Sequence, residues 1–251
     1  MAHPLTRKCV KLSSPLYDRI SILLAETEPE KHGQTTFADE KTILPTNQIL
    51  QETFYSQLGK QCVDFLGASL LLLILLPLML TTLLIVAWEH QSLKAALYRQ
   101  VRLGKNSKPY KLIKFRSMKI DAEALGPQFS HGKHDPRITN FGRLMRKYRI
   151  DELPQLINVI KGDMSLVGPR PERPIFHEKI CMDIPEFNLR LSIKPGITGL
   201  AQVNNGYAGS EIESHRQKLC YDLLYIEELS IWQDIKIGFR TIIPVLRGEG
   251  V

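Results

Sequence analysis

The chain has 251 residues, enough for one well-packed catalytic domain with appendages but too few for several independent domains. Its 33 Lys and Arg residues outnumber its 26 Asp and Glu residues, and the formal net charge of +7 favours phosphate-bearing partners such as nucleotides, lipid headgroups or nucleic acid. The cysteines at positions 9, 62, 181 and 220 show no Cys-x-x-Cys spacing, which argues against a zinc site and is typical of a reducing compartment.

Three regions of the chain differ in composition. Residues 1–59 mix Pro, Thr, Glu and Gln with short apolar patches and contain neither a repeat nor a motif. Residues 60–88 are dominated by an uncharged apolar run, and residues 89–251 open with a basic segment. These shifts predict an N-terminal extension of unassigned role, a membrane helix and a catalytic domain, in that order.

The apolar run, residues 65–88, is long enough to cross a hydrocarbon layer of about 30 Å, because a helix rises about 1.5 Å per residue. Residues 70–76 lack any polar side chain, whereas helices of soluble proteins usually keep a wet face. Pro77 removes one backbone hydrogen bond and predicts a kink. Basic residues concentrate after the run, which places that side in the cytoplasm. This pattern leaves open a spanning helix and a re-entrant helix whose ends are both cytoplasmic.

Two elements are predicted next. Aromatic and apolar residues alternate with basic ones over residues 108–116, which predicts a half-exposed strand that presents cations to a nucleotide, a bilayer or a nucleic acid. Apolar residues then recur at helical spacing from Phe141 to Tyr148, with Arg and Lys on the other face. This spacing predicts an amphipathic helix over residues 140–149.

Asp151 and Glu152 follow this helix. Asp151 suits an N-cap and Pro154 a first turn, so a second helix is expected to begin there and to end at Gly162. The positive end of a helix stabilises ionised carboxylates and attracts phosphate. Asp151 is therefore a candidate nucleophile toward phosphorus, and Glu152 a candidate ligand of Mg²⁺. The pair alone is also compatible with a plain cap beside a surface glutamate.

Five motifs occur in a fixed order along the chain. They are Lys114-Phe115-Arg116-Ser117-Met118, Asp135-Pro136-Arg137-Ile138-Thr139, Asp151-Glu152-Leu153-Pro154-Gln155, Gly162-Asp163-Met164-Ser165-Leu166-Val167-Gly168-Pro169-Arg170-Pro171 and Pro195-Gly196-Ile197-Thr198-Gly199-Leu200-Ala201-Gln202. Over residues 60–251 this collinear set resembles the bacterial sugar transferases, which are polyprenyl-phosphate phosphoglycosyl transferases of the monotopic type.

The resemblance implies an α+β, mainly helical domain anchored by a re-entrant helix broken at Pro77. It places this domain at the bacterial inner membrane, with the active site facing the cytoplasm. It also implies that Asp151 attacks the sugar-bearing phosphorus of a UDP-sugar, that UMP leaves, and that polyprenyl (undecaprenyl) phosphate takes the sugar phosphate. This would be the first step of glycan or exopolysaccharide assembly, before further glycosyltransferases act.

The resemblance also assigns roles to individual residues. Asp151 and Glu152 would be catalytic, and Glu152 would help bind Mg²⁺. The implied phosphate-binding residues are Lys114, Arg116 and Arg170, and the implied supporting residues are Asp135, Arg137 and Asp234.

One motif departs from the family pattern, and one pair of histidines resembles a metal site. Family members usually carry a Gly-Arg pair soon after the Gln-Val step, whereas residues 202–207 here read Gln-Val-Asn-Asn-Gly-Tyr. A substrate-contacting arginine is therefore expected to be missing, with Arg190 or Arg216 as replacements in space. His131 and His134 are expected to be solvated rather than zinc ligands, because no further ligand set accompanies them.

Two other functions are compatible with the residues themselves. One is a membrane-tethered module that binds anions without catalysis, and steeply salt-dependent binding without UMP release would indicate it. The other is a membrane hydrolase that cleaves nucleotide sugars with water, and product formation independent of polyprenyl phosphate would indicate it. The resemblance implies membrane lipid as a partner and no nucleic acid.

Overall fold

The computed structural model describes residues 55–124, 126–128, 135–205 and 212–250, which belong to one compact unit. The expectations for residues 1–54, for His131 and His134, and for Gly206 and Tyr207 lie outside the described residues.

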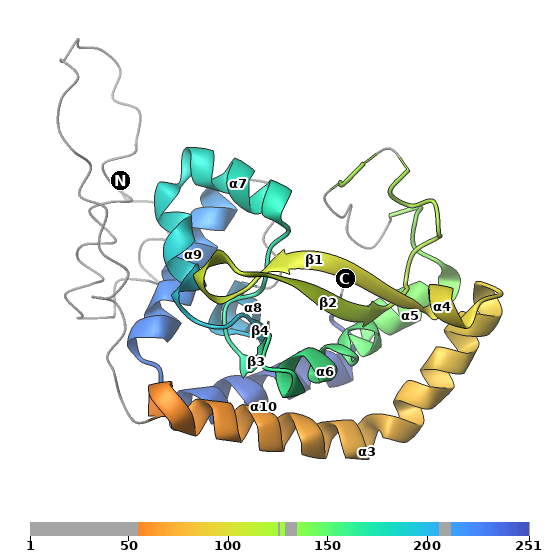
Figure 1. The fold of residues 1–251 in the computed structure, drawn as a ribbon, viewed down its shortest axis with the longest axis horizontal. Coiled ribbons are helices and arrows are strands. Elements are labelled where there is room, and N and C mark those ends of the chain that lie inside the picture. Colours follow the sequence, from red (N-terminus) through yellow and green to blue (C-terminus); the bar gives the residue numbers. More distant parts are fainter. Residues whose placement is uncertain (1–54, 125, 129–134, 206–211, 251) are drawn as a thin grey trace, which may run out of the picture. The chain divides into compact units, whose positions relative to one another are not determined.

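Helix α3 (Lys60–Glu89) is the predicted membrane helix, and a short π-helical turn, Tyr55–Gly59, leads into it. It is long and apolar enough to cross a membrane. The helix runs through Pro77, where the Thr81 hydroxyl donates to the Pro77 carbonyl at 2.9 Å. Figure 1 shows α3 curving toward α4 (Leu93–Ala96), so the helix is bent but continuous rather than interrupted.

Helix α3 has two apolar faces with different surroundings. Ala68, Met79 and Val86 are buried where the helix packs on α4 and α6 (Gln155–Ile160). The opposite face is exposed. Its large exposed side chains include Leu66, Leu70, Leu73, Ile74, Leu84 and Trp88. An exposed apolar face of this length marks an interaction surface, and for so long a helix the natural partner is lipid.

The predicted half-exposed strand over residues 108–116 is confirmed as β2 (Pro109–Phe115), and a second strand, β1 (Leu97–Leu103), lies beside it. They pair antiparallel, with Leu97 opposite Phe115. The free edge of β2 is covered by Asn158 of α6, whose side chain accepts from the Ile113 amide at 3.0 Å and donates to the Lys111 carbonyl at 2.9 Å. Because the Asn158 side chain satisfies both backbone groups, the hairpin is fixed on α6.

A second, very small sheet brings two distant loops together. Strands β3 (Ser165–Val167) and β4 (Gly196–Thr198) pair in parallel. The connection between them includes α7 (Pro174–Asp183) and a 3-10 helix, Pro185–Ser192. The pairing places the loop after β3 beside the loop around β4.

The remaining described elements are helices. They are α5 (Asn140–Lys147), α8 (Leu200–Asn205), α9 (Ile212–Glu227) and α10 (Ile231–Arg247). The Thr139 hydroxyl caps α5 by accepting from the Gly142 amide at 2.9 Å. The predicted helix over residues 140–149 is confirmed with a slightly earlier end, although Leu144 of its apolar stripe is exposed. The predicted mainly helical α+β class is confirmed.

The hydrophobic core is built jointly by α3 and the residues that follow it. One cluster joins Ala68 to Leu112, Leu156, Val159 and Met164. A second cluster joins Met79 and Val86 to Ala96, Phe115 and Met145. Helix α3 is therefore part of the same packing that positions β2, α5 and α6.

Candidate active site

Asp151 and Glu152 lie in a 3-10 turn, Ile150–Glu152, between α5 and α6. Arg149, which precedes this turn, has a φ of 55°, a left-handed conformation that non-glycine residues rarely adopt. The predicted N-cap role of Asp151 is wrong, because α6 begins only at Gln155. Helix α6 ends at Ile160, and the predicted stop at a glycine is confirmed by Gly162, which follows shortly after it with a φ of 82°. Neighbouring side chains, rather than a helix end, therefore set the electrostatics of the two carboxylates.

The two carboxylates are nearly buried, with Asp151 6% and Glu152 9% exposed. Arg170 grips Glu152 with two hydrogen bonds, Nη1 to one oxygen at 3.3 Å and Nη2 to the other. Burial acts to raise the pKa of Glu152, but the charge and hydrogen bonds of Arg170, together with the charges of Arg149 and Lys114, lower this pKa. Burial and the Glu152 charge raise the pKa of Asp151 to about 6. The dyad thus combines an ionised Glu152 with an Asp151 that titrates near neutral pH.

Several cations surround this dyad. Lys114 of β2, Arg146 of α5 and Arg170 all act to lower the pKa of Asp151. Burial lowers the pKa of Lys114 to about 8, although the Asp151 charge opposes this effect. Arg146 is held in place by donating from Nε to the Ser117 hydroxyl at 2.9 Å. The sequence indicated Arg146 only as part of the basic face of the helix over residues 140–149, and its proximity to Asp151 becomes visible only in three dimensions.

Arg116, the other predicted phosphate-binding residue next to β2, has a different environment. Its Nε donates to the Ala95 carbonyl at 2.7 Å, near the end of α4. The Tyr98 ring lies 5.2 Å from the Arg116 guanidinium and 5.3 Å from the Lys114 ammonium. Lys114 therefore shares the electrostatic environment of the dyad, whereas Arg116 fastens the strand to α4.

Asp135 and Arg137 form a local ion pair before α5. The wholly buried Asp135 carboxylate accepts from Arg137 Nε at 2.8 Å, from Nη2 at 2.6 Å and from the Arg137 backbone amide at 3.0 Å. The Arg137 carbonyl in turn accepts from the Lys119 amide at 2.9 Å. These contacts shape the segment that leads into α5, and the predicted supporting role in the site stays a prediction.

Asp234, at the start of α10, accepts three hydrogen bonds from distant residues. The donors are the Tyr55 hydroxyl at 2.5 Å, the Lys60 ammonium at 2.6 Å and the Tyr225 hydroxyl at 2.6 Å. The Tyr225 hydroxyl oxygen also lies 3.0 Å from the Val167 carbonyl oxygen. Through Tyr225, Asp234 therefore links the beginning of α3 to β3, and its predicted supporting role in the site stays a prediction.

The loop after β3, Gly168-Pro169-Arg170-Pro171, packs tightly on the loop around β4. A Cβ atom added to Gly196 would lie 2.1 Å from the Gly168 nitrogen, and one added to Gly199 would lie 2.3 Å from the Gly168 carbonyl oxygen. Both distances are too short for any side chain, so only glycine permits this approach. The motif glycines thus hold the Arg170 loop against β4.

The two arginines expected to replace a missing substrate contact differ in position. The Arg190 side chain is 1% exposed and pairs with Asp222 at 2.7 Å. This burial excludes Arg190 as a direct substrate contact, so that prediction is wrong. Arg216 is half-buried on α9, and its replacement role stays a prediction.

A buried carboxylate pair among several cations, in a fold that carries an exposed apolar helix, is the arrangement expected of a membrane-associated enzyme that acts on phosphates. The chain belongs to the bacterial sugar transferase family, whose model matches residues 55–248.

Named relatives support this family. The chain is 41% identical over 191 residues to a UDP-N-acetylgalactosamine-undecaprenyl-phosphate N-acetylgalactosaminephosphotransferase of Aeromonas hydrophila, covering 76% of this chain and 44% of the relative. It is 40% identical over 191 residues to a UDP-glucose:undecaprenyl-phosphate glucose-1-phosphate transferase of Caulobacter vibrioides, covering 75% and 70%. An Escherichia coli protein of the same name is 40% identical over 190 residues, covering 74% and 40%. The chain thus spans less than half of two of these three relatives.

Proposed function

We propose that this protein transfers a sugar phosphate from a UDP-sugar to polyprenyl (undecaprenyl) phosphate through a covalent intermediate on Asp151. The observation that carries the proposal is the nearly buried Asp151 beside an ionised Glu152 and among Lys114, Arg146 and Arg170. The names of the relatives, which specify glucose 1-phosphate or N-acetylgalactosamine phosphate transfer to undecaprenyl phosphate, support this class of reaction.

The proposed reaction has two displacements at one phosphorus. An Asp151 carboxylate oxygen attacks the sugar-bearing phosphorus of the UDP-sugar, the bond to the bridging oxygen breaks, and UMP leaves with the electron pair. An oxygen of polyprenyl phosphate then attacks the same phosphorus and releases the Asp151 carboxylate. A covalent intermediate lets a water-soluble donor and a lipid acceptor use the site in turn. The cations around Asp151 stabilise negative charge on the phosphate oxygens in both steps.

Mg²⁺ fits this site as a partner of the substrate phosphates. Magnesium is usually held by one or two carboxylates together with phosphate oxygens, rather than by a complete protein cage. Two adjacent buried carboxylates match that requirement, and Glu152, ionised beside Arg170, is the protein ligand we propose. When bound, the ion would neutralise charge on the diphosphate. Arg170 holds the Glu152 carboxylate in place, and Asp151 remains the nucleophile.

We further propose that α3 is re-entrant, which the attachment of its two ends supports. At its start Lys60 donates to Asp234 at 2.6 Å, and at its end Glu89 accepts from the Thr139 hydroxyl at 3.1 Å. A spanning helix would place its ends about 30 Å apart on opposite sides of the bilayer. Since both ends contact the same polar unit, they belong on one side, and the basic segment after α3 favours the cytoplasm.

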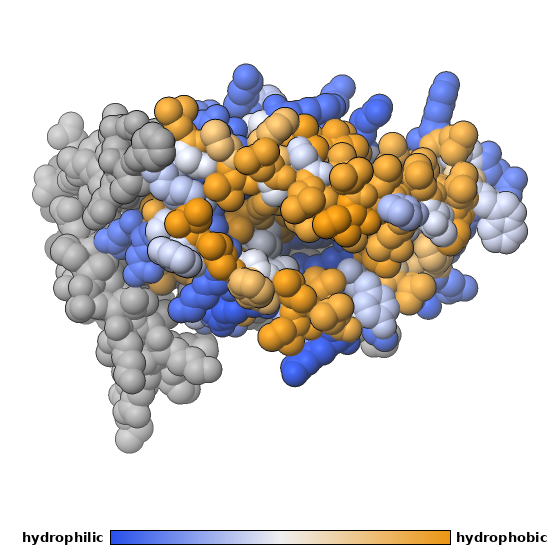
Figure 2. Space-filling model, turned by 90° about the horizontal axis from the view of Figure 1, so that it is seen from below, coloured by the Kyte–Doolittle hydropathy of each residue, from blue (hydrophilic) through white to orange (hydrophobic). Residues whose placement is uncertain are grey.

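Helix α10 extends the proposed membrane-facing surface. Figure 2 shows a face of the molecule that is largely hydrophobic. The large exposed apolar residues of α10 include Trp232, Ile235, Phe239, Ile242, Ile243 and Leu246. An amphipathic helix with such a face lies in the membrane interface. In the inner membrane this arrangement would keep the site close to a lipid acceptor.

The topology is tested with thiols at both ends of α3. Cys62 is an exposed native thiol near the start, and Lys94 is exposed just after the end. In a variant with Cys9, Cys181 and Cys220 changed to Ser, we expect Cys62 and a Lys94→Cys thiol to react with a membrane-impermeant maleimide only in inside-out vesicles. Reaction of Cys62 in right-side-out vesicles would sink the re-entrant proposal.

The function is tested by a screen for UMP release from UDP-glucose, UDP-N-acetylgalactosamine and other UDP-sugars, with and without polyprenyl phosphate. We expect sustained UMP release and a lipid product from at least one donor only when the lipid is present. Sustained release without lipid would indicate a hydrolase. No release from any donor, together with binding that falls steeply with salt, would indicate an anion-binding module.

A further inference from the structure

The backbone of the Arg170 loop is fixed by an uninterrupted series of hydrogen bonds. Four consecutive carbonyls each accept from a residue far away in sequence, and the donors come from β4, the 3-10 helix Pro185–Ser192 and β1. The acceptor and donor pairs are Pro169 with the Gly196 amide at 2.9 Å, Arg170 with Arg190 Nη2 at 2.7 Å, Pro171 with Arg102 Nη1 at 3.0 Å, and Glu172 with the Leu103 amide at 3.2 Å.

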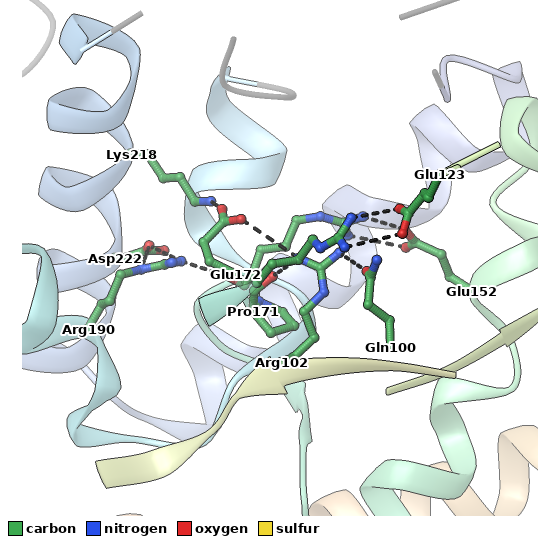
Figure 3. Close-up of polar contacts among 11 residues, drawn as sticks. Gln100, Arg102, Glu123, Glu152, Pro171, Glu172, Arg190, Lys218 and Asp222 are labelled. Atoms are coloured by element: carbon green, nitrogen blue, oxygen red, sulfur yellow. Dashed lines mark hydrogen bonds and ion pairs between the residues drawn. The ribbon is translucent and has the colours of Figure 1, made fainter. Parts of the chain in front are cut away.

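Arg190 is the more deeply buried of the two side-chain donors. Its residue exposure is 2%, and its guanidinium lies 4.7 Å from the centre of the Phe187 ring. Nε donates a hydrogen bond to an Asp222 carboxylate oxygen at 2.9 Å, and Nη2 forms an ion pair with the same oxygen at 2.7 Å. Nη2 also donates to the Arg170 carbonyl. Figure 3 shows Arg190 extending beside Asp222 toward the segment that carries Pro171 and Glu172.

A second ion pair secures the same segment. The Glu172 carboxylate lies between Lys218, with which it is hydrogen-bonded, and Arg102, whose Nη1 is 3.8 Å away. Burial acts to raise the pKa of Glu172, but Lys218, Arg190 and Arg102 together lower it to about 2. The Glu172 carboxylate is therefore ionised at neutral pH, beside the Arg102 side chain that donates to the Pro171 carbonyl.

Burying an ion pair is a poor means of stabilising a fold, because desolvation offsets most of the attraction between the charges. A pair such as Arg190–Asp222 is better suited to fixing one geometry. The atom it fixes is the carbonyl of Arg170, the residue whose guanidinium grips Glu152 with two hydrogen bonds. Functional groups held by a rigid second layer keep the alignment that catalysis requires.

We propose that Arg190 is a positioning residue for the reaction: by holding the Arg170 carbonyl, it fixes the Arg170 guanidinium against Glu152. Arg190 does not touch the substrate and acts only through Arg170. This role rests on the proposed function of the dyad, but the geometry it concerns can be measured without turnover.

The test separates positioning from folding by removing both buried charges together. In Arg190→Met/Asp222→Leu no uncompensated charge remains, so we expect the full-length protein in detergent to keep its thermal unfolding midpoint within a few degrees. Amide hydrogen exchange in a peptide covering residues 165–173 should accelerate at least about 10-fold, because the Arg170 loop loses an anchor. Exchange in α6 should not change.

The kinetic readout uses the UDP-sugar found active in the screen. A misplacement of about 1 Å can cost on the order of 100-fold in rate, so we expect kcat to fall about 10- to 100-fold with KM changed less than about 3-fold. Arg190→Lys retains a charge for Asp222 but cannot reproduce the guanidinium fork, so it should give the same changes in smaller degree. If the double variant does not fold, the Arg190→Lys variant tests whether Arg190 positions Arg170.

Unchanged loop exchange in a folded variant would overturn the proposal, as would wild-type kcat in the stable double variant. If the wild-type protein releases no UMP from any UDP-sugar, the proposed function fails, and the exchange measurement still decides whether Arg190 holds the Arg170 loop.

Discussion

Two arginine–carboxylate pairs lie within one network, and they differ in their access to solvent. The Arg170 and Glu152 side chains are 26% and 11% exposed, whereas those of Arg190 and Asp222 are 1% and 2% exposed. An accessible pair can exchange some of its hydrogen bonds for a phosphate, but a sealed pair cannot. The comparison shows that burial, rather than residue type, decides which arginine can bind a ligand.

The pKa values of the two carboxylates shift in opposite directions. Burial raises the pKa of Asp222, and its pairing with Arg190 only partly opposes this effect. For Glu152, the charge and hydrogen bonds of Arg170 act together with the charges of Arg149 and Lys114, and the pKa is lowered despite burial. The sealed pair is therefore the costlier one to keep ionised, which is consistent with a structural task that requires a fixed geometry.

The largest expected contrast is in stability. Arg190→Met leaves Asp222 as an uncompensated buried charge, so we expect the free energy of unfolding to fall by about 3–5 kcal/mol. Arg170→Met disrupts the more accessible pair and should cost less, about 1–2 kcal/mol, since the charges of Arg149 and Lys114 still act on Glu152. Denaturant unfolding of both variants in detergent measures the difference. Equal losses would show that the two pairs do not differ as their exposures indicate.

A second contrast is in catalysis. Arg170→Met should lower kcat/KM by about 100-fold, because a group that stabilises phosphate charge is lost. Arg170→Lys should recover part of this loss, since lysine keeps the charge but not the bidentate fork. Arg247→Met, which removes an arginine 70% exposed on α10, is the control and should keep wild-type kinetics. An Arg170→Met enzyme as active as that control would remove Arg170 from the site.

A smaller effect on catalysis is expected from a change of pH, because pH sets the protonation of Asp151 and Lys114. The pKa of Asp151, raised to about 6, means that the nucleophilic carboxylate is lost as pH falls through this value. The pKa of Lys114, lowered to about 8, means that its ammonium is lost as pH rises through that value. The profile of kcat/KM should be a bell that falls about 10-fold by pH 5 and by pH 9.

A substitution at Lys114 identifies the basic limb of that profile. Arginine stays charged at all accessible pH values, so Lys114→Arg should move or abolish the fall above pH 8 and leave the acid limb in place. An unchanged basic limb would assign it to another group.

Local sequence patterns predicted the elements well where burial and local spacing agree. Alternation of apolar and basic residues predicted the strand over residues 109–115, and helical spacing predicted the helix after Thr139. Gly162 correctly marked the end of α6. The N-cap assigned to Asp151 was wrong, because the left-handed Arg149 starts a 3-10 turn that no local pattern signals.

The motifs predicted most of the residues that the structure brings together around Asp151, but not which arginine is near the carboxylates and which is buried elsewhere. The sequence indicated the Asp-Glu pair, Lys114 and Arg170, yet it offered Arg190 as a substrate contact and overlooked Arg146. Arg190 is sealed by Asp222, which lies 32 residues away, and Arg146 is oriented by Ser117, 29 residues away. Such partners are set by tertiary packing, which single-residue patterns do not contain.

The most direct test of the account is covalent labelling of Asp151. Wild-type protein incubated with a UDP-sugar labelled in its sugar, without lipid acceptor, should retain label on the protein, and polyprenyl phosphate should then remove it. Asp151→Asn should retain none, whereas Glu152→Gln should still be labelled but more slowly and with a higher requirement for Mg²⁺. Wild-type levels of label on Asp151→Asn, or near-normal transfer by that variant to polyprenyl phosphate, would contradict the assignment of Asp151 as the nucleophile.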